Sequence, residues 1–149
     1  RVMSLRDGSK KMSKSDSSDY SRIMLSDDPK TIEAKVKKAK TDSLPVPDNL
    51  KDAKSRLEAY NLITIYAAIT NTDEEKVIQE FGNKEFSIFK QKLSDSLIAV
   101  LQPISTEMNK LLDDKKYLDE IIKSGSQRAS AIAKPVINEV YDCIGLLRS

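Results

Sequence analysis

Apolar residues recur at helical spacing throughout the part of the chain that follows residue 45. Spacings of three and four residues place them on one face of a helix, and no segment here alternates apolar and polar residues as strands do. The pattern predicts helices over residues 48–70, 72–82, 85–112, 115–125 and 126–147. Because such helices cover their apolar faces against one another, we expect a mainly-α fold whose C-terminal part is an antiparallel helical bundle.

Polar caps, glycines and a proline mark the expected ends of these helices. Asp48 is the expected N-cap of the first helix, and Thr72 with Glu75 has the spacing of a capping box at the start of the second. Pro103 is expected to kink the third helix or split it in two. Two glycines are expected to end the second and fourth helices, Gly82 and Gly125.

The apolar faces of these helices are the expected core. In the first helix this face consists of Leu50, Leu57, Ile65 and Ile69. In the third helix it consists of Phe86, Phe89, Leu93, Leu97, Val100, Ile104, Met108, Leu111 and Leu112. Cys143 falls on the apolar phase of the last helix, so a buried structural thiol is expected rather than a nucleophile.

The first 44 residues follow a different pattern. Residues 1–5 lean apolar and are typical of a strand end or an extended segment, and a loop rich in Gly, Ser and Lys follows. Asp28 as N-cap and Pro29 at the first helical position then predict a helix. Its apolar edge consists of Ile32, Val36 and Ala39, and the lysines expected to face elsewhere are Lys35, Lys37, Lys38 and Lys40. Two prolines in "LPVPDN" mark a boundary, so we expect one unit over 1–44 and another over 45–149.

Composition limits the classes of function. The chain has 149 residues, of which 39% are apolar and 32% charged, as in proteins that form a core. No apolar run approaches the roughly 20 residues that span a bilayer, and no signal-peptide pattern opens the chain, so a cytoplasmic protein without a membrane partner is expected. With no histidine and one cysteine, neither a disulfide framework, a zinc site nor a histidine-based triad is expected, and no metal ligands are assigned.

Positive charge gathers at the start of the chain. Residues 1–40 contain eleven Lys and Arg against six Asp and Glu, a net charge of +5, whereas residues 41–149 contain 14 against 17, a net charge of −3. The stretch "DGSKKMSKSDSSDY" combines flexible lysines, serine hydroxyls and loop backbone amides. These groups suit an anion with several oxygens, such as a nucleotide phosphate. The residues alone leave open an exposed linker, a kinase target or a basic patch for nucleic acid.

A family resemblance narrows these alternatives. Residues 11–15 spell KMSKS, the signature of class I aminoacyl-tRNA synthetases, and they stand within "RVMSLRDGSKKMSKSD", "LSDDPKTIEAKVKKAKTDS", "NLITIYAAIT" and "FKQKLSDSLIAVLQPI". Together these segments resemble bacterial tryptophanyl-tRNA synthetases over nearly the whole chain. The tyrosyl enzymes are the nearest relatives and carry a similar loop. The resemblance implies that residues 1–44 are the C-terminal remnant of a Rossmann-like nucleotide-binding domain and that residues 45–149 are an anticodon-binding bundle.

The resemblance also assigns roles to individual residues. Lys11 and Lys14 would contact the phosphates of ATP, supplied with Mg²⁺, and Ser13 and Ser15 would assist them. Met12 and the backbone around Val2 would flank the adenine, although Val2 could equally be a core strand residue. Basic residues on predicted helices could dock the tRNA, although a solvated surface is the plainer interpretation of each: Lys54, Arg56, Arg128 and Lys134.

As a whole, the resemblance implies a tryptophan–tRNA ligase that activates tryptophan with ATP, transfers it to tRNA(Trp) and forms a homodimer. The amino acid pocket and a histidine-containing motif of the family lie upstream of the matched region, and this chain has no histidine. We therefore expect these 149 residues alone to be inactive. Two alternatives stay open here, a tyrosine-specific synthetase and a helical module that binds RNA or protein without catalysis.

Overall fold

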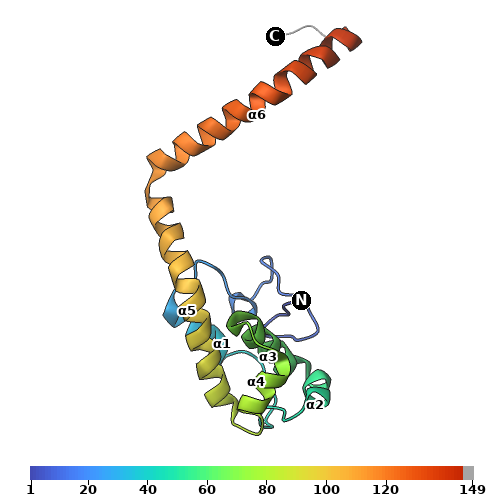
Figure 1. Cartoon of the computed structure of the whole chain (residues 1–149), viewed down its shortest axis with the longest axis vertical. Helices are drawn as coiled ribbons and strands as arrows, with labels where there is room; N and C mark the ends of the chain where they lie inside the picture. Colours follow the sequence, from blue (N-terminus) through green and yellow to red (C-terminus); the bar gives the residue numbers. More distant parts are fainter. Residues whose placement is uncertain (146–149) are drawn as a thin grey trace. The chain divides into compact units, whose positions relative to one another are not determined.

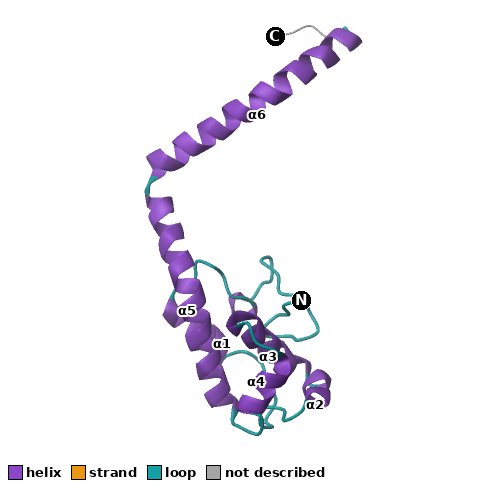
Figure 2. Cartoon of the chain, in the orientation of Figure 1, coloured by secondary structure: helices purple, strands orange, loops and turns teal. Residues whose placement is uncertain are grey.

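The computed structural model describes residues 1–145 and confirms the mainly-α prediction. Its elements are the 3₁₀ turn η1 (Asp19–Ser21) and the helices α1 (Pro29–Lys37), α2 (Leu50–Ser55), α3 (Leu57–Thr70), α4 (Glu74–Phe81), α5 (Phe86–Asp113) and α6 (Lys115–Ile144), shown in Figure 1. Within residues 1–145 the β pairing amounts to one isolated antiparallel bridge, between Met3 and Lys11, and Figure 2 shows loops elsewhere between the helices. The expected helix end at residues 146–147 lies outside the described residues.

The chain divides into two compact units, and the boundary between them follows Thr106. The first unit contains η1, α1–α4 and most of α5, and the second begins at Glu107 and contains α6. The first unit includes both sides of the boundary expected at residues 44 and 45, which stays a prediction. None of the described helices is long and apolar enough to cross a membrane.

An aromatic cluster forms the centre of the first unit. The rings of Tyr66, Phe81 and Phe89 lie 5.1–5.7 Å apart between centroids, in tilted or edge-to-face arrangements. Helices α2, α3 and α4 pack against one another. The apolar edge predicted for α1, consisting of Ile32, Val36 and Ala39, is buried in the same core.

The helix predicted over residues 48–70 is broken. It begins at Leu50 with Asn49 rather than Asp48 as N-cap, because the Asn49 side chain accepts a hydrogen bond from the backbone N–H of Asp52. Arg56 leaves the helical conformation (φ −108°, ψ 81°) and separates α2 from α3. The break changes the phase of the apolar face, so Leu57, predicted to be buried, is exposed.

Helix α4 ends at Gly82 as predicted but does not begin with a capping box. Its N-cap is Asp73, without a side-chain hydrogen bond to the helix. Thr72 instead shares a hydroxyl–hydroxyl hydrogen bond with Thr70 (2.8 Å), so it is unavailable for the expected cap. The expected partner Glu75 lies within the first turn.

Only the first half of the predicted apolar face of α5 is core. Phe86, Phe89, Leu93 and Leu97 are buried, as predicted, whereas the exposed residues are Val100, Ile104, Leu111 and Leu112. At 28 residues, α5 extends beyond the core of the first unit. It continues through Pro103 as one helix rather than two, because proline removes one backbone hydrogen bond and leaves the neighbouring turns intact.

Helix α6 also differs from its prediction. It passes through Gly125 and ends at Gly145, which has the left-handed conformation (φ 70°) typical of a C-cap. Glycine in mid-helix costs only about 1 kcal/mol relative to alanine, and no neighbouring atom lies within 4 Å of a Cβ built on Gly125 to force a turn. The helix buries none of its residues, so Cys143, expected to be buried, is exposed.

Candidate functional site

The KMSKS segment (residues 11–15) is attached to a short N-terminal hairpin, residues 2–12. The Ser4 N–H donates to the Lys10 carbonyl (2.8 Å), and the Met12 N–H donates to the Val2 carbonyl (3.3 Å). At the turn, the Asp7 carboxylate accepts hydrogen bonds from the backbone and side chain of Ser9. These hydrogen bonds lower the pKa of Asp7, so the turn is stabilised by an ionised carboxylate.

Helix α3 holds the first strand of this hairpin through Asn61. The Asn61 side chain accepts from the Met3 N–H (2.9 Å) and donates to the carbonyls of Met3 (3.0 Å) and Ser4 (3.3 Å). Asn61 is buried. Sequence reasoning did not single it out, although it lies on the predicted apolar face, four residues before Ile65. A polar residue in that position needs hydrogen-bond partners, and this was the signal available.

The turn of the hairpin lies directly on the start of α3. A Cβ built on Gly8 would be 2.7 Å from the Leu57 carbonyl carbon and 2.8 Å from the Glu58 nitrogen. Only glycine allows the two backbones to approach so closely. Beside this contact, Lys40 pairs with Glu58 at 2.8 Å. The hairpin is therefore held at its strand and at its turn by the same helix.

The chain that leaves the KMSKS segment is held by α1. The Lys35 ammonium lies 2.7 Å from an Asp27 oxygen and 3.0 Å from an Asp19 oxygen. Burial opposes its charge, but the hydrogen bonds that the ammonium donates to both carboxylates, together with their attraction, outweigh burial and raise the pKa of Lys35. This side chain is 1% exposed, so the prediction that Lys35 faces away from the core is wrong. The two carboxylates take the place of water as partners of the buried ammonium.

The KMSKS segment itself projects from these two attachments. Lys11, Ser13, Lys14 and Ser15 are exposed, and Met12 packs partly against the core. Neither lysine ammonium has a carboxylate within ion-pairing distance among residues 1–145. The hydroxyls of Ser13 and Ser15 lie 3.0 Å apart. The segment therefore presents two unneutralised cations and two hydroxyls to a polyanion.

The structure brings Val2 and Met12 together. They are joined by the backbone hydrogen bond from Met12 to Val2, at the point where the KMSKS segment leaves the hairpin. Val2 is 44% exposed, so its alternative role as a core residue is wrong. Its place beside Met12 is compatible with an apolar surface next to a bound nucleotide.

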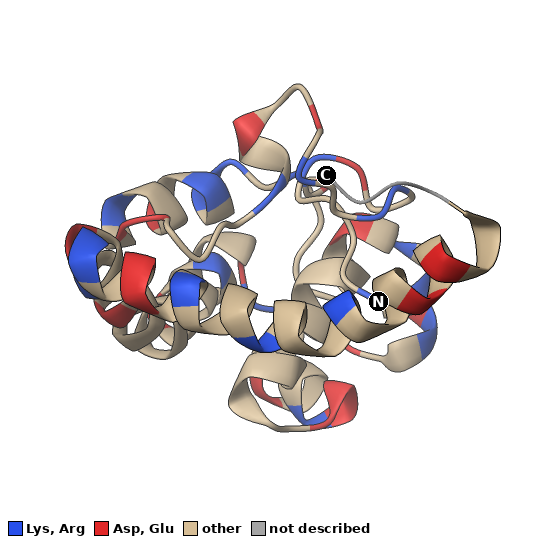
Figure 3. Cartoon of the chain, turned by 90° about the horizontal axis from the view of Figure 1, so that it is seen from above, with Lys and Arg blue, Asp and Glu red and all other residues tan. Residues whose placement is uncertain are grey.

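The four basic residues expected to meet tRNA fall into two groups. Lys54 and Arg56 belong to the first unit, and Arg128 and Lys134 belong to α6 in the second. Lys54, Arg128 and Lys134 are exposed. Along the sequence of α6, lysine and arginine residues are interspersed with aspartate and glutamate residues. Figure 3 shows that residues of both charges are spread over the chain.

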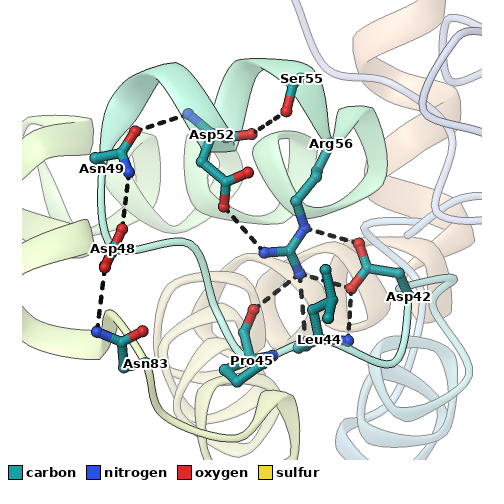
Figure 4. A network of polar contacts seen from close by, with 9 residues as sticks. All are labelled: Asp42, Leu44, Pro45, Asp48, Asn49, Asp52, Ser55, Arg56 and Asn83. Atoms are coloured by element: carbon teal, nitrogen blue, oxygen red, sulfur yellow. Dashed lines mark hydrogen bonds and ion pairs between the residues drawn. The ribbon is translucent and has the colours of Figure 1, made fainter.

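Arg56 is committed to contacts within the chain. Its guanidinium makes two hydrogen bonds to the Asp42 carboxylate (2.6 and 2.8 Å), a third to Asp52 and another to the Pro45 carbonyl (2.8 Å), all drawn in Figure 4. The hydrogen bond from Arg56 lowers the pKa of Asp42. These contacts fasten the proline-containing linker to α2 and explain the break at Arg56. Arg56 is therefore less available to an external ligand than the other three basic residues, which are exposed.

Replacing Arg56 with alanine is expected to lower the free energy of unfolding by about 2 kcal/mol, because a two-pronged, charge-assisted contact and a linker carbonyl lose their partner. Urea unfolding of the full-length protein measures this. Lys54→Ala is the control on the same turn of chain and should leave stability unchanged. If Arg56→Ala and Lys54→Ala had the same free energy of unfolding, the network would contribute no stability, and that result would contradict this prediction.

The Arg56 network also has a defined pH dependence. Because the pKa of Asp42 is lowered on folding, its ion pair contributes stability above the ordinary value of 3.8 and loses it as pH falls through the lower folded value. The difference in stability between the unaltered protein and Arg56→Ala should therefore shrink only in strong acid.

A groove between α1 and α5 is a concave region of the first unit. Its lining includes Lys30, Lys37 and Lys90. The Lys90 ammonium, however, donates to the Ala39 carbonyl (2.7 Å) and the Thr41 hydroxyl (3.1 Å). Burial lowers the pKa of Lys90. The Lys90 ammonium is therefore already bound to oxygens of the chain that follows α1. The KMSKS segment, whose lysines are exposed, is the better candidate for an anion site.

Comparison with known proteins identifies the family. A family model described as tRNA synthetases class I (W and Y) matches residues 1–102. The chain belongs to this family. Its curated relatives include the tryptophan–tRNA ligases of Agrobacterium fabrum, 50% identical over 148 residues, and Mesorhizobium japonicum, 47% identical over 148 residues. These matches confirm the resemblance of this chain to bacterial tryptophanyl-tRNA synthetases.

Solved structures of the family agree with the fold. The tryptophanyl-tRNA synthetase from Campylobacter jejuni, complexed with ADP and tryptophan, matches 97% of this chain with a TM-score of 0.77 and 26% identity. This chain covers 43% of that structure and 42% of the length of the Agrobacterium and Mesorhizobium relatives. It therefore spans less than half of the proteins that it matches.

Proposed function

We propose that this chain is the part of a tryptophan–tRNA ligase that closes on the phosphates of ATP and docks tRNA(Trp). The observation that carries the proposal is the KMSKS segment, whose two lysines are exposed and unpaired within residues 1–145 while the hairpin and the exit behind them are fixed. The relatives named tryptophan–tRNA ligase support tryptophan over tyrosine as the amino acid.

The proposed role of the lysines lies in the first of two steps. The tryptophan carboxylate attacks the α-phosphorus of ATP, the bond to the bridging oxygen breaks, and tryptophanyl-adenylate and pyrophosphate form. Lys11 and Lys14 neutralise the β- and γ-phosphates as negative charge develops on the leaving pyrophosphate. Ser13 and Ser15 donate hydrogen bonds to the same oxygens, and Val2 and Met12 border the adenine. The acyl group then passes to the terminal ribose of tRNA.

Mg²⁺ fits this proposal as an ion carried by ATP. No group of three or more acidic or thiol side chains able to hold a metal occurs among the described residues, so no residue of the chain is assigned to it. Magnesium commonly binds phosphate oxygens and keeps several waters. Its chemistry here would be to neutralise phosphate charge beside the lysines.

The remaining partners belong to the proposed whole protein. The Campylobacter structure contains ADP and tryptophan, which supports a nucleotide and tryptophan as ligands. Lys54, Arg128 and Lys134 are exposed cations that could contact the tRNA backbone. We also propose that the whole protein forms a homodimer and is located in the cytoplasm, as the family resemblance implies.

ATP–pyrophosphate exchange by the full-length protein tests the function. With tryptophan and tyrosine compared in parallel, we expect exchange that depends on tryptophan. Exchange with tyrosine alone would keep the role of the lysines and change the substrate. Exchange with neither amino acid would contradict the proposal and favour a binding module without catalysis.

The 149-residue chain alone is expected to show no exchange. It covers 42% of its Agrobacterium relative and contains no histidine. Adenylation requires both reactants to be held in line, and holding them accounts for much of the rate. Tryptophan-dependent exchange by the isolated chain would contradict this expectation.

A further inference from the structure

We propose that Asn61 on α3 is a positioning residue for the ATP loop, which it holds through the N-terminal hairpin. The proposal rests on the proposed function for the identity of the ligand. The contacts that support it come from the helical part of the chain, residues 45–149, and reach the part that carries KMSKS.

The hydrogen-bonding pattern of Met3 gives Asn61 its role. Met3 and Lys11 face each other across the bridge, but the hydrogen bonds of this pair run between their neighbours, from Ser4 to Lys10 and from Met12 to Val2. In such a pair, the N–H and C=O of the facing residue point away from the partner strand. The Met3 N–H and C=O both meet the Asn61 amide, at 2.9 and 3.0 Å.

The Asn61 amide therefore takes the place of a third strand. It supplies one acceptor and one donor to the same residue, as a neighbouring strand does, and its amide nitrogen makes a third hydrogen bond, to the Ser4 carbonyl at 3.3 Å. Asn61 is 4% exposed, so water does not substitute for it. Fixing Met3 on one side fixes the position of Lys11 on the other.

A second contact on the same face of α3 limits how the hairpin can tilt. Gly8 lies against the backbone of Leu57 and Glu58, one helical turn before Asn61. The hairpin thus meets α3 at its turn and at its strand. Because the two contacts lie about one helical turn apart, they fix the orientation of the hairpin on α3 as well as its position. The orientation of the hairpin sets the direction in which the KMSKS segment leaves it.

Removing the Asn61 side chain is expected to impair the use of ATP but not the binding of tryptophan. Loss of the Asn61 amide leaves the lysines present but allows the hairpin that carries them to shift, and misplacement of a binding group by about 1 Å can cost up to a hundredfold in rate. We expect Asn61→Ala to lower kcat/KM for ATP in pyrophosphate exchange by at least about tenfold while KM for tryptophan stays within about twofold of wild type.

Thr64→Val is the matched control. Thr64 lies on the same helix, is partly buried and donates to Glu74 on α4 (3.0 Å), so its loss weakens α3 packing without touching the hairpin. Hydrogen–deuterium exchange of the full-length proteins supplies a readout apart from catalysis. Residues 2–12 should take up deuterium faster in Asn61→Ala than in Thr64→Val.

The two possible failures can be distinguished. If the unaltered protein shows no pyrophosphate exchange with either amino acid, the proposed function fails. If the unaltered protein is active, but Asn61→Ala and Thr64→Val match in kcat/KM for ATP and in deuterium uptake over residues 2–12, the positioning role is overturned.

Discussion

Lys14→Ala in the full-length protein is expected to lower kcat for tryptophan-dependent ATP–pyrophosphate exchange by about 100- to 1,000-fold, the range found when one preorganised donor is removed from a developing negative charge. Lys14 is exposed, and among residues 1–145 no carboxylate neutralises it, so its charge is available to the leaving pyrophosphate. KM for ATP should change far less than kcat, because the interaction is stronger in the transition state than in the ground state.

Lys10→Ala is the control for this prediction. Lys10 is a neighbouring exposed lysine whose ammonium pairs with Asp7 at 3.3 Å on the surface of the turn. Its removal should change exchange by about twofold or less, since exposed ion pairs contribute little. If Lys14→Ala raised KM for ATP and left kcat unchanged, Lys14 would bind substrate and transition state uniformly. That result would contradict its role in stabilising the transition state.

Lys35→Ala is expected to have the largest effect on stability, lowering the free energy of unfolding by about 3 kcal/mol, as when a partner of a buried ion pair is removed. The substitution leaves the Asp27 carboxylate, which is 10% exposed, without its cation. Asp27 also accepts the Met24 N–H at 2.8 Å, so the chain after the KMSKS segment should loosen as well. Urea unfolding of the full-length protein measures the loss.

Two further variants make this result specific. Lys37→Ala removes an exposed lysine from the same helix and should change stability by about 0.5 kcal/mol or less. The double variant Lys35→Met with Asp27→Asn removes both buried charges and should recover part of the loss. Equal stability of Lys35→Ala and Lys37→Ala would show that the buried pair contributes nothing.

The pH dependence of this pair follows from the raised pKa of Lys35. A group whose pKa rises on folding contributes stability that is fully present below its ordinary pKa, here 10.5, and lost as pH rises through the folded value. The difference between wild type and Lys35→Ala should therefore be constant near neutral pH and shrink only in alkali.

Local patterns in the sequence were sufficient for the class of fold and for the candidate site. Helical periodicity predicted α1, α4 and the first half of α5, because an apolar face is a property of residues three and four positions apart. The KMSKS segment was found from five consecutive residues, because the motif is local in the sequence and its lysines and serines are exposed rather than packed against the rest of the chain. Family membership followed from the same residues and their surroundings.

Helix ends and burial were less predictable wherever they depended on distant partners. The break at Arg56 depends on Asp42, fourteen residues earlier, and on the Pro45 carbonyl. The exposure of Cys143 depends on how much of α6 is covered, which periodicity alone does not state. An amphipathic pattern shows which face of a helix could be buried, whereas burial itself requires a neighbouring element.

The sequence by itself determined that this chain is mainly helical and that it belongs with class I synthetases, and it was sufficient to propose which lysines meet ATP. Only the tertiary structure decided what holds those lysines in place. Asn61 is 58 residues from Met3 in the chain, and Lys35 is sixteen from Asp19. Because a buried polar side chain is stable only beside its partners, and these partners are brought together by folding, their roles are visible in the folded chain alone.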